Sequence, residues 1–599
     1  MGKKVFASGC RILLVSLVLI ILSAGHIHAQ SISEVQDNER SIRILATSDI
    51  HGKFYPYLYA QNTEDTSGSL AQLATAIKEF RNEDTILVDC GDSIQDNSAD
   101  IFLGEDIHPM IEGLNRLGFD IGVTGNHEFN FGIDVTKKTI ASFAGKVLVG
   151  NVYDQNGEPL ADGYTILDRN GVRIAIIGMV TPYIQFWDDK NLEGCTVTDP
   201  VEETRKIIDS IQGQYDVLVG AMHMGVEKDY EYPHSSAREL AEECPEFDVI
   251  IASHEHVLVE GEIINGVLVV ENKHMGKTMS VIDISLSREG EGWTVSEVKS
   301  KSLDMSMFSP DPEFMEAFLP YHEYALQDAM TVIGHFYGDY LVEKSEIDRI
   351  PRVIIEDSAY VDLINNVLMH YGEATVSSTA ASRMDCEVGR GDIHKCDMSM
   401  IYRYYNTLYT FRMTGSQLKA LMEWEVGFIN QYKEGDLTIS FEVSRRTFNY
   451  HMFSGVNYEI DISQEIGSRI RNLTWPDGRP VEDDDSFIYA VDSYCANNFL
   501  LRPGAIYSED DMPELIARDL RSDLGGIADM ILDYIVNECD GVLVPQCDNN
   551  WRIVGNDWDP ELHQQVVEYV KAGKLEVPCP FDVASGPITE DDLKAVSGE

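Results

Sequence analysis

The sequence has few basic side chains for its length. Its 599 residues include 46 lysines and arginines against 100 aspartates and glutamates, which gives a formal net charge of −54. Binding to a nucleic-acid backbone requires a basic surface, so this composition argues against nucleic-acid polymers as partners. It also opposes long-range attraction of anionic substrates. A phosphate-binding pocket in this chain would therefore need a local positive field of its own, from metal ions and a few arginines.

Cysteine is scarce and is never spaced as C-x-x-C. The absence of that pair argues against thiolate zinc sites of the paired type and against thioredoxin-like redox chemistry. Ten cysteines are present, and Cys10 falls in an apolar N-terminal segment. For an oxidising compartment the spacing favours two local disulfides, Cys386 with Cys396 and Cys539 with Cys547.

Long apolar runs are also scarce. The clearest run, residues 12–22, follows a basic start with Lys3 and Lys4 and precedes residues 27–29, which end in alanine. This pattern is typical of a secretory signal peptide, so we expect residues 1–29 to be removed and the protein to be secreted or periplasmic. An uncleaved membrane anchor is the alternative. No later segment is apolar enough to span a bilayer and neither end carries a lipid-anchor motif, so we expect no stable anchor after cleavage.

The rest of the chain alternates strand-like apolar runs with helical patterns. The length predicts more than one domain, and the alternation over residues 41–304 predicts an α/β domain. We expect a linker helix at residues 310–330, a second domain at residues 331–554 and a C-terminal extension at residues 555–599. Further helical patterns cover residues 70–80, 107–117, 136–143, 200–211, 360–370, 415–429 and 560–572.

Oxygen and nitrogen donors follow five of the apolar runs. The runs are residues 42–46, 85–88, 121–123, 217–220 and 249–252, and the donors at or after them are Asp49, His51, Asp92, Asn126, His223, His254 and His256. Open α/β sheets gather their ligands at the carboxyl ends of strands, so we expect these side chains to meet. One such histidine alone is as often structural, but the whole set predicts a dinuclear metal centre bridged by Asp92. Mixed Asp, Asn and His ligands suit Zn, Mn, Co or Fe better than Mg or Ca.

His127 follows the predicted ligand Asn126 and is the candidate catalytic residue. It would protonate a leaving alkoxide or stabilise charge at phosphorus. The alternative is a histidine that only orients Glu128 or a metal ligand.

Together these motifs resemble the 5'-nucleotidase family of calcineurin-like metallophosphoesterases. The motifs are Ser48-Asp49-Ile50-His51-Gly52, Gly91-Asp92, Gly125-Asn126-His127-Glu128, His223 and Ser253-His254-Glu255-His256. The resemblance implies a four-layer α/β/β/α catalytic domain at residues 41–304, followed by a mixed α/β nucleotide-binding domain. It also implies two divalent ions, with Zn, Mn or Co favoured. Asp49, His51, Asp92 and His256 would surround one ion, and Asp92, Asn126, His223 and His254 the other.

The second half resembles the family's C-terminal substrate-binding domain. The matching segments are residues 404–408, 453–461 and 492–494. In such domains two aromatic rings sandwich the nucleobase, and Tyr404 and Tyr494 occupy the matching places, with Asn406 as a polar contact. Core packing is the alternative for each ring taken alone. Residues 377–391 depart from the family's Gly-Gly-x-Arg loop on the phosphate side, and Arg383 or Arg390 would reach the substrate there.

Two details favour the branch of the family that hydrolyses 2',3'-cyclic nucleotides and then 3'-nucleotides. One is Thr181-Pro182-Tyr183-Ile184, which leads to Trp187. The other is Asn130, which stands at a position where 5'-nucleotidases are similar to one another in carrying Asp. Because Asn cannot be the anionic partner of an imidazolium, a simple His–Asp dyad is not expected. The sequence thus predicts a secreted two-metal phosphoesterase acting on nucleotides. The alternatives are a 5'-nucleotidase or nucleotide-diphosphate hydrolase, and a catalytically weak nucleotide-binding surface protein. The sequence does not indicate an oligomeric state.

Overall fold

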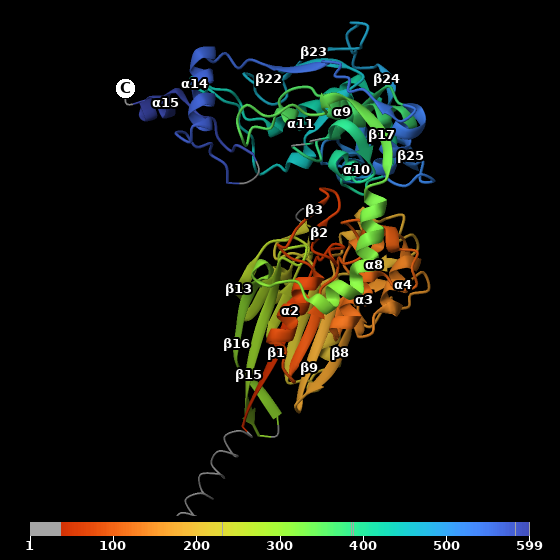
Figure 1. The fold of residues 1–599 in the computed structure, drawn as a ribbon, viewed down its shortest axis with the longest axis vertical. Coiled ribbons are helices and arrows are strands. Elements are labelled where there is room, and N and C mark those ends of the chain that lie inside the picture. The colour runs from red at the N-terminus through yellow and green to blue at the C-terminus, as the bar shows by residue number, and fades with distance from the viewer. Residues whose placement is uncertain are drawn as a thin grey trace, which may run out of the picture. The chain divides into compact units, whose positions relative to one another are not determined.

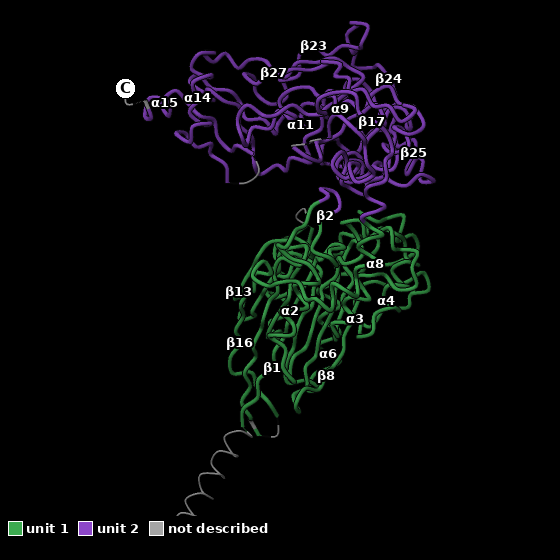
Figure 2. The backbone as a smooth tube through the Cα atoms, viewed as in Figure 1, with its two compact units in different colours: residues 1–58, 63–325 green, residues 59–62, 326–599 purple. Residues whose placement is uncertain are grey.

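The computed structural model describes residues 38–229, 232–290, 292–384, 386, 388–580 and 583–597. The predicted signal peptide, residues 1–29, lies outside this part of the chain. Two compact units are present, unit 1 with residues 1–58 and 63–325, and unit 2 with residues 59–62 and 326–599 (Figure 2). Among the described helices, none combines the length and the apolar character needed to cross a membrane.

Two six-stranded sheets form the centre of unit 1 (Figure 1). The first has the order β16-β15-β1-β4-β5-β6, and β1, β4, β5 and β6 run parallel. The second has the order β13-β14-β12-β11-β9-β8, and β9, β11, β12 and β14 run parallel. The bounds in the first sheet are β1 Glu39–Thr47, β4 Thr85–Asp89, β5 Ile121–Val123, β6 Lys146–Leu148, β15 Thr278–Glu289 and β16 Gly292–Asp304. Those in the second are β8 Tyr164–Arg169, β9 Val172–Val180, β11 Val217–His223, β12 Val249–Ala252, β13 Val259–Ile264 and β14 Val267–Glu271.

The inner faces of the two sheets pack against each other. Ile44 and Val88 of the first sheet and Val219 and Ile251 of the second lie in one fully buried cluster. A separate buried cluster joins the outer face of the second sheet to α6 (Pro200–Ser210) and α7 (Ala237–Glu243). On the other side, α2 (Leu70–Phe80) links β1 to β4 and α3 (Pro109–Leu117) links β4 to β5. The predicted four-layer α/β/β/α fold is confirmed.

The predicted helices are confirmed, with small shifts at their ends. Besides α2, α3 and α6 they are α4 Ile133–Ser142, α8 Pro312–Ala329, α9 Ala359–Gly372, α11 Gly415–Glu425 and α14 Pro560–Lys571. Side-chain caps explain several starts, since Ser69 accepts from Ala71 N at α2 and Asp199 accepts from Val201 N at α6. Thr414 forms a reciprocal capping box with Gln417 at α11. The division between the two units falls within α8.

Unit 2 is built around a five-stranded sheet with the order β21-β18-β24-β20-β25. Its strands are β18 Val376–Ala380, β20 Leu408–Thr414, β21 His451–Ser454, β24 Ser486–Asp492 and β25 Glu514–Leu520. Val361 and Leu368 of α9 pack with Val376, Phe411 and Tyr489 of the sheet in one core. Val566 and Val567 of α14 and Ile588 belong to the same core, so the chain beyond residue 554 packs onto unit 2.

Both predicted disulfides are wrong, because Cys396, Cys539 and Cys547 are free thiols. Strand β19 (Gly389–His394) lies between Cys386 and Cys396. An extended strand of that length spans about 20 Å, whereas a disulfide needs Cα atoms within about 7 Å. Strand β26 (Val542–Leu543) lies between Cys539 and Cys547, and it pairs with β17 (Val332–Tyr340).

Candidate metal centre

Loops at the carboxyl ends of five strands bring all seven predicted ligands together. Asp49, His51 and His256 form one group and Asp92, His223 and His254 another, and within each group one ligand atom per residue lies within 4.8 Å of the others. Asn126 joins the second group, with Oδ1 3.0 Å from His223 Nε2 and 2.9 Å from His254 Nδ1. The juxtaposition is as the sequence predicted, and the metal-binding role of these residues stays a prediction.

Asp92 lies where the two groups adjoin. Its Oδ2 is 3.2 Å from His223 Nε2, and its backbone carbonyl accepts the N–H of His51 at 3.0 Å. Oδ1 accepts the N–H of His127 at 2.9 Å, and the buried Oδ2 has the imidazole of His223 as its close partner. A buried carboxylate is costly unless positive charge compensates it. A cation at this point would remove that cost, so the donor set fits a divalent metal centre.

The ligand loops adopt strained backbone conformations. Five of the seven predicted ligands, Asp49, His51, Asp92, His254 and His256, have φ between 47° and 81°. For residues other than glycine this left-handed region costs about 1–3 kcal/mol each and persists only where the surroundings enforce it. Such strain is typical of functional sites.

Close contacts between loops enforce this arrangement. A Cβ at Gly125 would lie 2.0 Å from Asp92 Oδ1, and one at Gly91 would lie 2.3 Å from Gly125 N. Glycine at both positions lets the loops after β4 and β5 touch. Glu128 then locks them, since its carboxylate accepts the N–H of Asp92, Ser93, Ile94 and Gly125 at 2.6–3.3 Å.

The carboxylates of the site raise the pKa of His51, His223 and His254. Burial alone lowers the pKa of His51, but the hydrogen bond and charge of Asp96, with Asp92 and Asp49 nearby, raise that pKa to about 9. Burial likewise lowers the pKa of His223, and the charge and hydrogen bond of Asp92 raise it to about 10. Cations bound here would replace these protons, as metal binding to histidine requires.

His127 is held by a chain of polar side chains. Its Nδ1 lies 2.9 Å from Gln95 Oε1 and 2.7 Å from Asn130 Oδ1. Asn130 Nδ2 donates to both oxygens of Asp188, at 3.0 and 3.1 Å, and this fixes which way the amide faces. With two oxygens beside it, Nδ1 must carry the proton. The other nitrogen, Nε2, is 3.8 Å from Asp92 Oδ2 and faces the ligand groups.

Sequence reasoning missed the residues that support the ligands and His127. Asp96 Oδ2 lies 3.0 Å from His51 Nδ1, and Asp229 Oδ1 lies 3.4 Å from His254 Nε2. Gln95 and Asp188 hold His127 as described above. These residues come from loops with no periodic pattern, and only the departure from Asp at position 130 hinted that another acid was needed. The segment that favoured the cyclic-nucleotide branch is also close, since the Trp187 ring is 5.4 Å from that of His254.

The predicted base-binding residues lie on two adjoining loops of unit 2. Thr407 N donates to Ser493 Oγ at 3.1 Å and Ser493 N donates to Thr407 O at 2.8 Å. These bonds join the segment carrying Tyr404 and Asn406 to the one carrying Tyr494. Both tyrosines are half-buried and pack against the unit 2 core, and Asn406 Nδ2 donates to a tyrosine hydroxyl, that of residue 402, at 2.9 Å.

The two predicted arginines lie on the segment between β18 and β19. Arg383 is half-buried, and the largely exposed Arg390 forms an ion pair with Asp339 at 3.1 Å. The role of both arginines in substrate binding stays a prediction.

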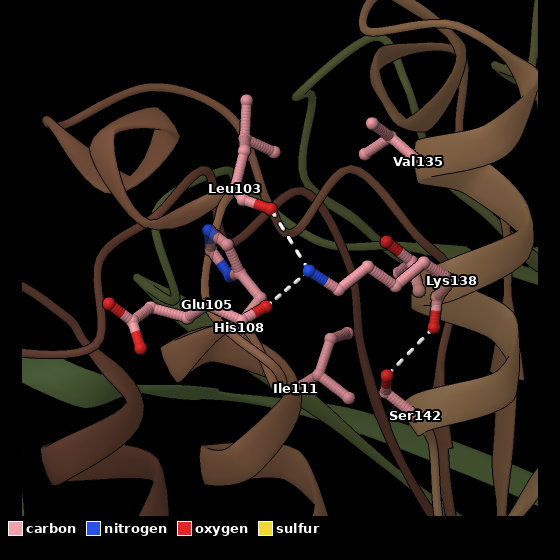
Figure 3. A pocket seen from close by; sticks show the side chains of 8 residues that line it. Leu103, Glu105, His108, Ile111, Val135, Lys138 and Ser142 are labelled. Carbon is pink, nitrogen blue, oxygen red and sulfur yellow. Dashed lines mark hydrogen bonds between the residues drawn. The ribbon is translucent and has the colours of Figure 1, made fainter.

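A small pocket elsewhere in unit 1 contains none of the predicted ligands. It lies among η1 (Ala99–Phe102), α3 and α4 and includes His108 and Ser142 in its lining (Figure 3). Lys138 Nζ donates to the carbonyls of Leu103 and Glu105 there. Burial lowers the pKa of His108 to about 4, so the charged groups in this lining are Glu105 and Lys138.

Comparison with protein families agrees with this site. Residues 42–258 match the calcineurin-like phosphoesterase family, and residues 333–499 match the 5'-nucleotidase C-terminal domain. Fold and donor set thus define a metallophosphoesterase, a class that binds divalent metals. With both domains in one chain, the protein belongs to the 5'-nucleotidase family of calcineurin-like metallophosphoesterases.

Several relatives carry more specific names. The chain is 26% identical to a 2',3'-cyclic-nucleotide 2'-phosphodiesterase/3'-nucleotidase of Yersinia enterocolitica, over 88% of this chain and 90% of the relative. It is 27% identical to the trifunctional nucleotide phosphoesterase protein YfkN of Bacillus subtilis, over 91% of this chain but only 41% of that longer protein. A putative 5'-nucleotidase from Staphylococcus aureus shares the fold, with a TM-score of 0.72 and 19% identity over 86% of this chain and all of that one.

Proposed function

We propose that this protein is a secreted, dinuclear-metal phosphoesterase that hydrolyses 2',3'-cyclic nucleotides to 3'-nucleotides and then to nucleoside and phosphate. The observation that carries this proposal is the pair of ligand groups meeting at Asp92, with Nε2 of His127 facing them. The relatives named for this activity, at 25–26% identity, support the choice of substrate. Secretion rests on the signal-like pattern at residues 1–29 and is tested by N-terminal sequencing of the mature protein.

Asp92 would be shared by two ion positions. Asp49, His51 and His256 would hold one divalent ion, and Asn126, His223 and His254 the other. Ions bound there supply Lewis acidity and stabilise negative charge at a phosphoryl group. Zn, Mn or Co suits this mixture of carboxylate, amide and imidazole donors.

His127 would act on the leaving oxygen. Opening the cyclic phosphate releases the 2' oxygen, and the second hydrolysis releases the 3' oxygen. Each leaves as an alkoxide that needs one proton, which the doubly protonated imidazolium of His127 would donate from Nε2, leaving the neutral ring with its proton on Nδ1. Because Gln95 and Asn130 hold Nδ1–H, the ring keeps Nε2 directed toward the ligand groups. An imidazole fixed in this way is positioned for the same transfer in both reactions.

Unit 2 would supply recognition of the base. Tyr404 and Tyr494 would stack on the nucleobase, and Asn406 would contact its polar edge. Arg383 or Arg390 would bind on the phosphate side. Stacking tolerates any base, so this clamp implies broad base specificity.

A substrate panel tests the proposal. Protein loaded with Mn, Co or Zn would be assayed on 2',3'-cyclic AMP, 3'-AMP and 5'-AMP, with Asp92→Ala as the control for contaminating phosphatases. We expect turnover of the first two substrates and little of the third. Preferential hydrolysis of 5'-AMP would instead identify a 5'-nucleotidase, and nucleotide binding without turnover in the metal-loaded protein would identify a binding protein.

A further inference from the structure

A second cluster of metal-ligating side chains lies in the core of unit 2. Glu425, His451 and Cys495 each offer one ligand atom, and these atoms lie within 4.8 Å of one another. Their exposed fractions are 1%, 3% and 0%. They come from the end of α11, the start of β21 and the end of α12 (Ser493–Cys495), three segments that are far apart in the sequence.

The carboxylate of Glu425 is only half satisfied. Its Oε2 accepts the N–H of His451 at 3.2 Å, but the buried Oε1 accepts no hydrogen bond from the described residues. A buried carboxylate oxygen without a donor is strongly unfavourable unless a proton or a cation compensates it. An imidazole and a thiol within ligand distance point to a cation.

The histidine is oriented as metal-binding histidines are. Its Nδ1 is 2.9 Å from Ser378 Oγ, which leaves Nε2 facing the cluster. A hydrogen bond at the non-ligating nitrogen is the usual way in which a protein aims a histidine at a metal. Nε2 is 3.7 Å from Asp492 Oδ2, and the other oxygen of Asp492 caps α12 by accepting the N–H of Cys495 at 2.9 Å. Asp492 Oδ2 therefore adjoins the cluster of three, and it would have to move inward to become a fourth ligand.

We propose that Glu425, His451, Cys495 and Asp492 bind one Zn²⁺ ion in the core of unit 2, separate from the predicted dinuclear centre. One thiolate, one imidazole and carboxylate oxygens suit zinc, and four protein ligands with no open position make a structural site. Zinc bond lengths place tetrahedral ligand atoms about 3.3–3.8 Å apart, so the cluster would need to contract by about 1 Å.

The charge of the cluster agrees with this assignment. Burial raises the pKa of the Glu425 carboxyl and of the Cys495 thiol, and burial lowers the pKa of His451. A bound dication reverses this preference, because it favours the carboxylate, the thiolate and the neutral imidazole together. The ion would also fix α12, where Tyr494 precedes Cys495, and so would hold one ring of the proposed base clamp.

The experiment uses the full chain and reads metal content, so it does not depend on catalysis. Asp92→Ala removes the shared ligand of the predicted dinuclear centre and leaves the cluster in unit 2 untouched. After exposure to excess Zn²⁺ and gel filtration, we expect this variant to keep one equivalent of zinc. Loaded with Co²⁺ instead, it should show a near-ultraviolet thiolate-to-cobalt charge-transfer band, which the predicted dinuclear centre cannot give because it has no thiolate ligand.

Further substitutions in the Asp92→Ala protein test which residues bind the proposed zinc ion. Cys495→Ala should abolish the cobalt band and remove the zinc equivalent, whereas Cys396→Ala, which alters another buried thiol of unit 2, should change neither. His451→Gln provides a second loss of ligand with little change of volume. Absence of the band from the Asp92→Ala chain itself, or its persistence after Cys495→Ala, would overturn the assignment. Failure of the substrate panel with the cobalt band present would reject the proposed activity and leave this site standing.

Discussion

Replacing Asp188 with Asn should slow cleavage of nucleotide substrates about 10- to 150-fold without altering metal content. Asp188 Oδ1 accepts from Asn130 Nδ2 and Asn191 Nδ2, each at 3.0 Å, and Oδ2 accepts from Asn130 at 3.1 Å. An amide in place of this buried carboxylate keeps one acceptor and turns an NH₂ group toward its neighbours. Asn130 can then rotate and present its own NH₂ to Nδ1–H of His127.

The magnitude follows from the single hydrogen bond at stake. Bonds to charged groups contribute about 1.5–3 kcal/mol, and each 1.36 kcal/mol of lost transition-state stabilisation is a factor of ten in rate. Complete removal of the imidazole in His127→Ala should cost more, about 10²–10⁴-fold. Because Asp188 acts through His127, the Asp188→Asn change should have almost no further effect in the His127→Ala protein.

The assay compares kcat/KM for 2',3'-cyclic AMP with that for an activated aryl phosphate ester. An aryl leaving group needs little protonation, so it should lose far less activity. Asp209→Asn, at an exposed position of α6, is the matched control for loss of one acidic side chain. Equal losses on both substrates, or fully additive effects with His127→Ala, would refute the relay from Asp188 through Asn130.

Three further perturbations address the metal centre and the base clamp. Asp92→Ala should remove the dinuclear centre and abolish turnover, as read by metal analysis and activity, and near-normal activity would show the ligand assignment to be wrong. Gly125→Ala should impair metal binding severely, because its Cβ would lie 2.0 Å from Asp92 Oδ1, whereas Gly104→Ala, with no atom within 4 Å of its Cβ, should be neutral. Tyr404→Ala or Tyr494→Ala should raise KM for nucleotides by the equivalent of about 1–3 kcal/mol of stacking and spare baseless aryl esters. Parallel losses on both substrate types would mark the rings as packing residues.

The parts of the site that follow directly from strand periodicity could be predicted. Asp49, Asp92 and His223 stand at or just after apolar runs, and parallel strands end at a common edge, so local pattern and sheet geometry together bring these side chains to one place. Helix starts were predictable for a similar reason, since caps such as Ser69 and Thr414 act within three residues of sequence.

The supporting residues could not be predicted in this way. Asp188 meets Asn130 across 58 residues of sequence and belongs to no periodic element. Its position depends on the path of a loop, which the hydrophobic pattern does not determine. The predicted disulfide between Cys386 and Cys396 failed on the same ground, because short spacing in sequence does not ensure closeness when a strand intervenes.

Each ligand group draws on both sheets of unit 1. His51 follows β1 of the first sheet, and its partner His256 follows β12 of the second. Asp92, after β4 of the first sheet, likewise contacts His223 at the end of β11 in the second. An ion in either position would therefore link the two layers at that edge, in addition to hydrogen bonds such as the one from His254 N to Asp49 Oδ1. Its binding energy would add to the cohesion of the sandwich, by about 4 kcal/mol when the free metal is a thousandfold above its dissociation constant. When metal is scarce, this edge of unit 1 would therefore lose stability before the rest of the fold does.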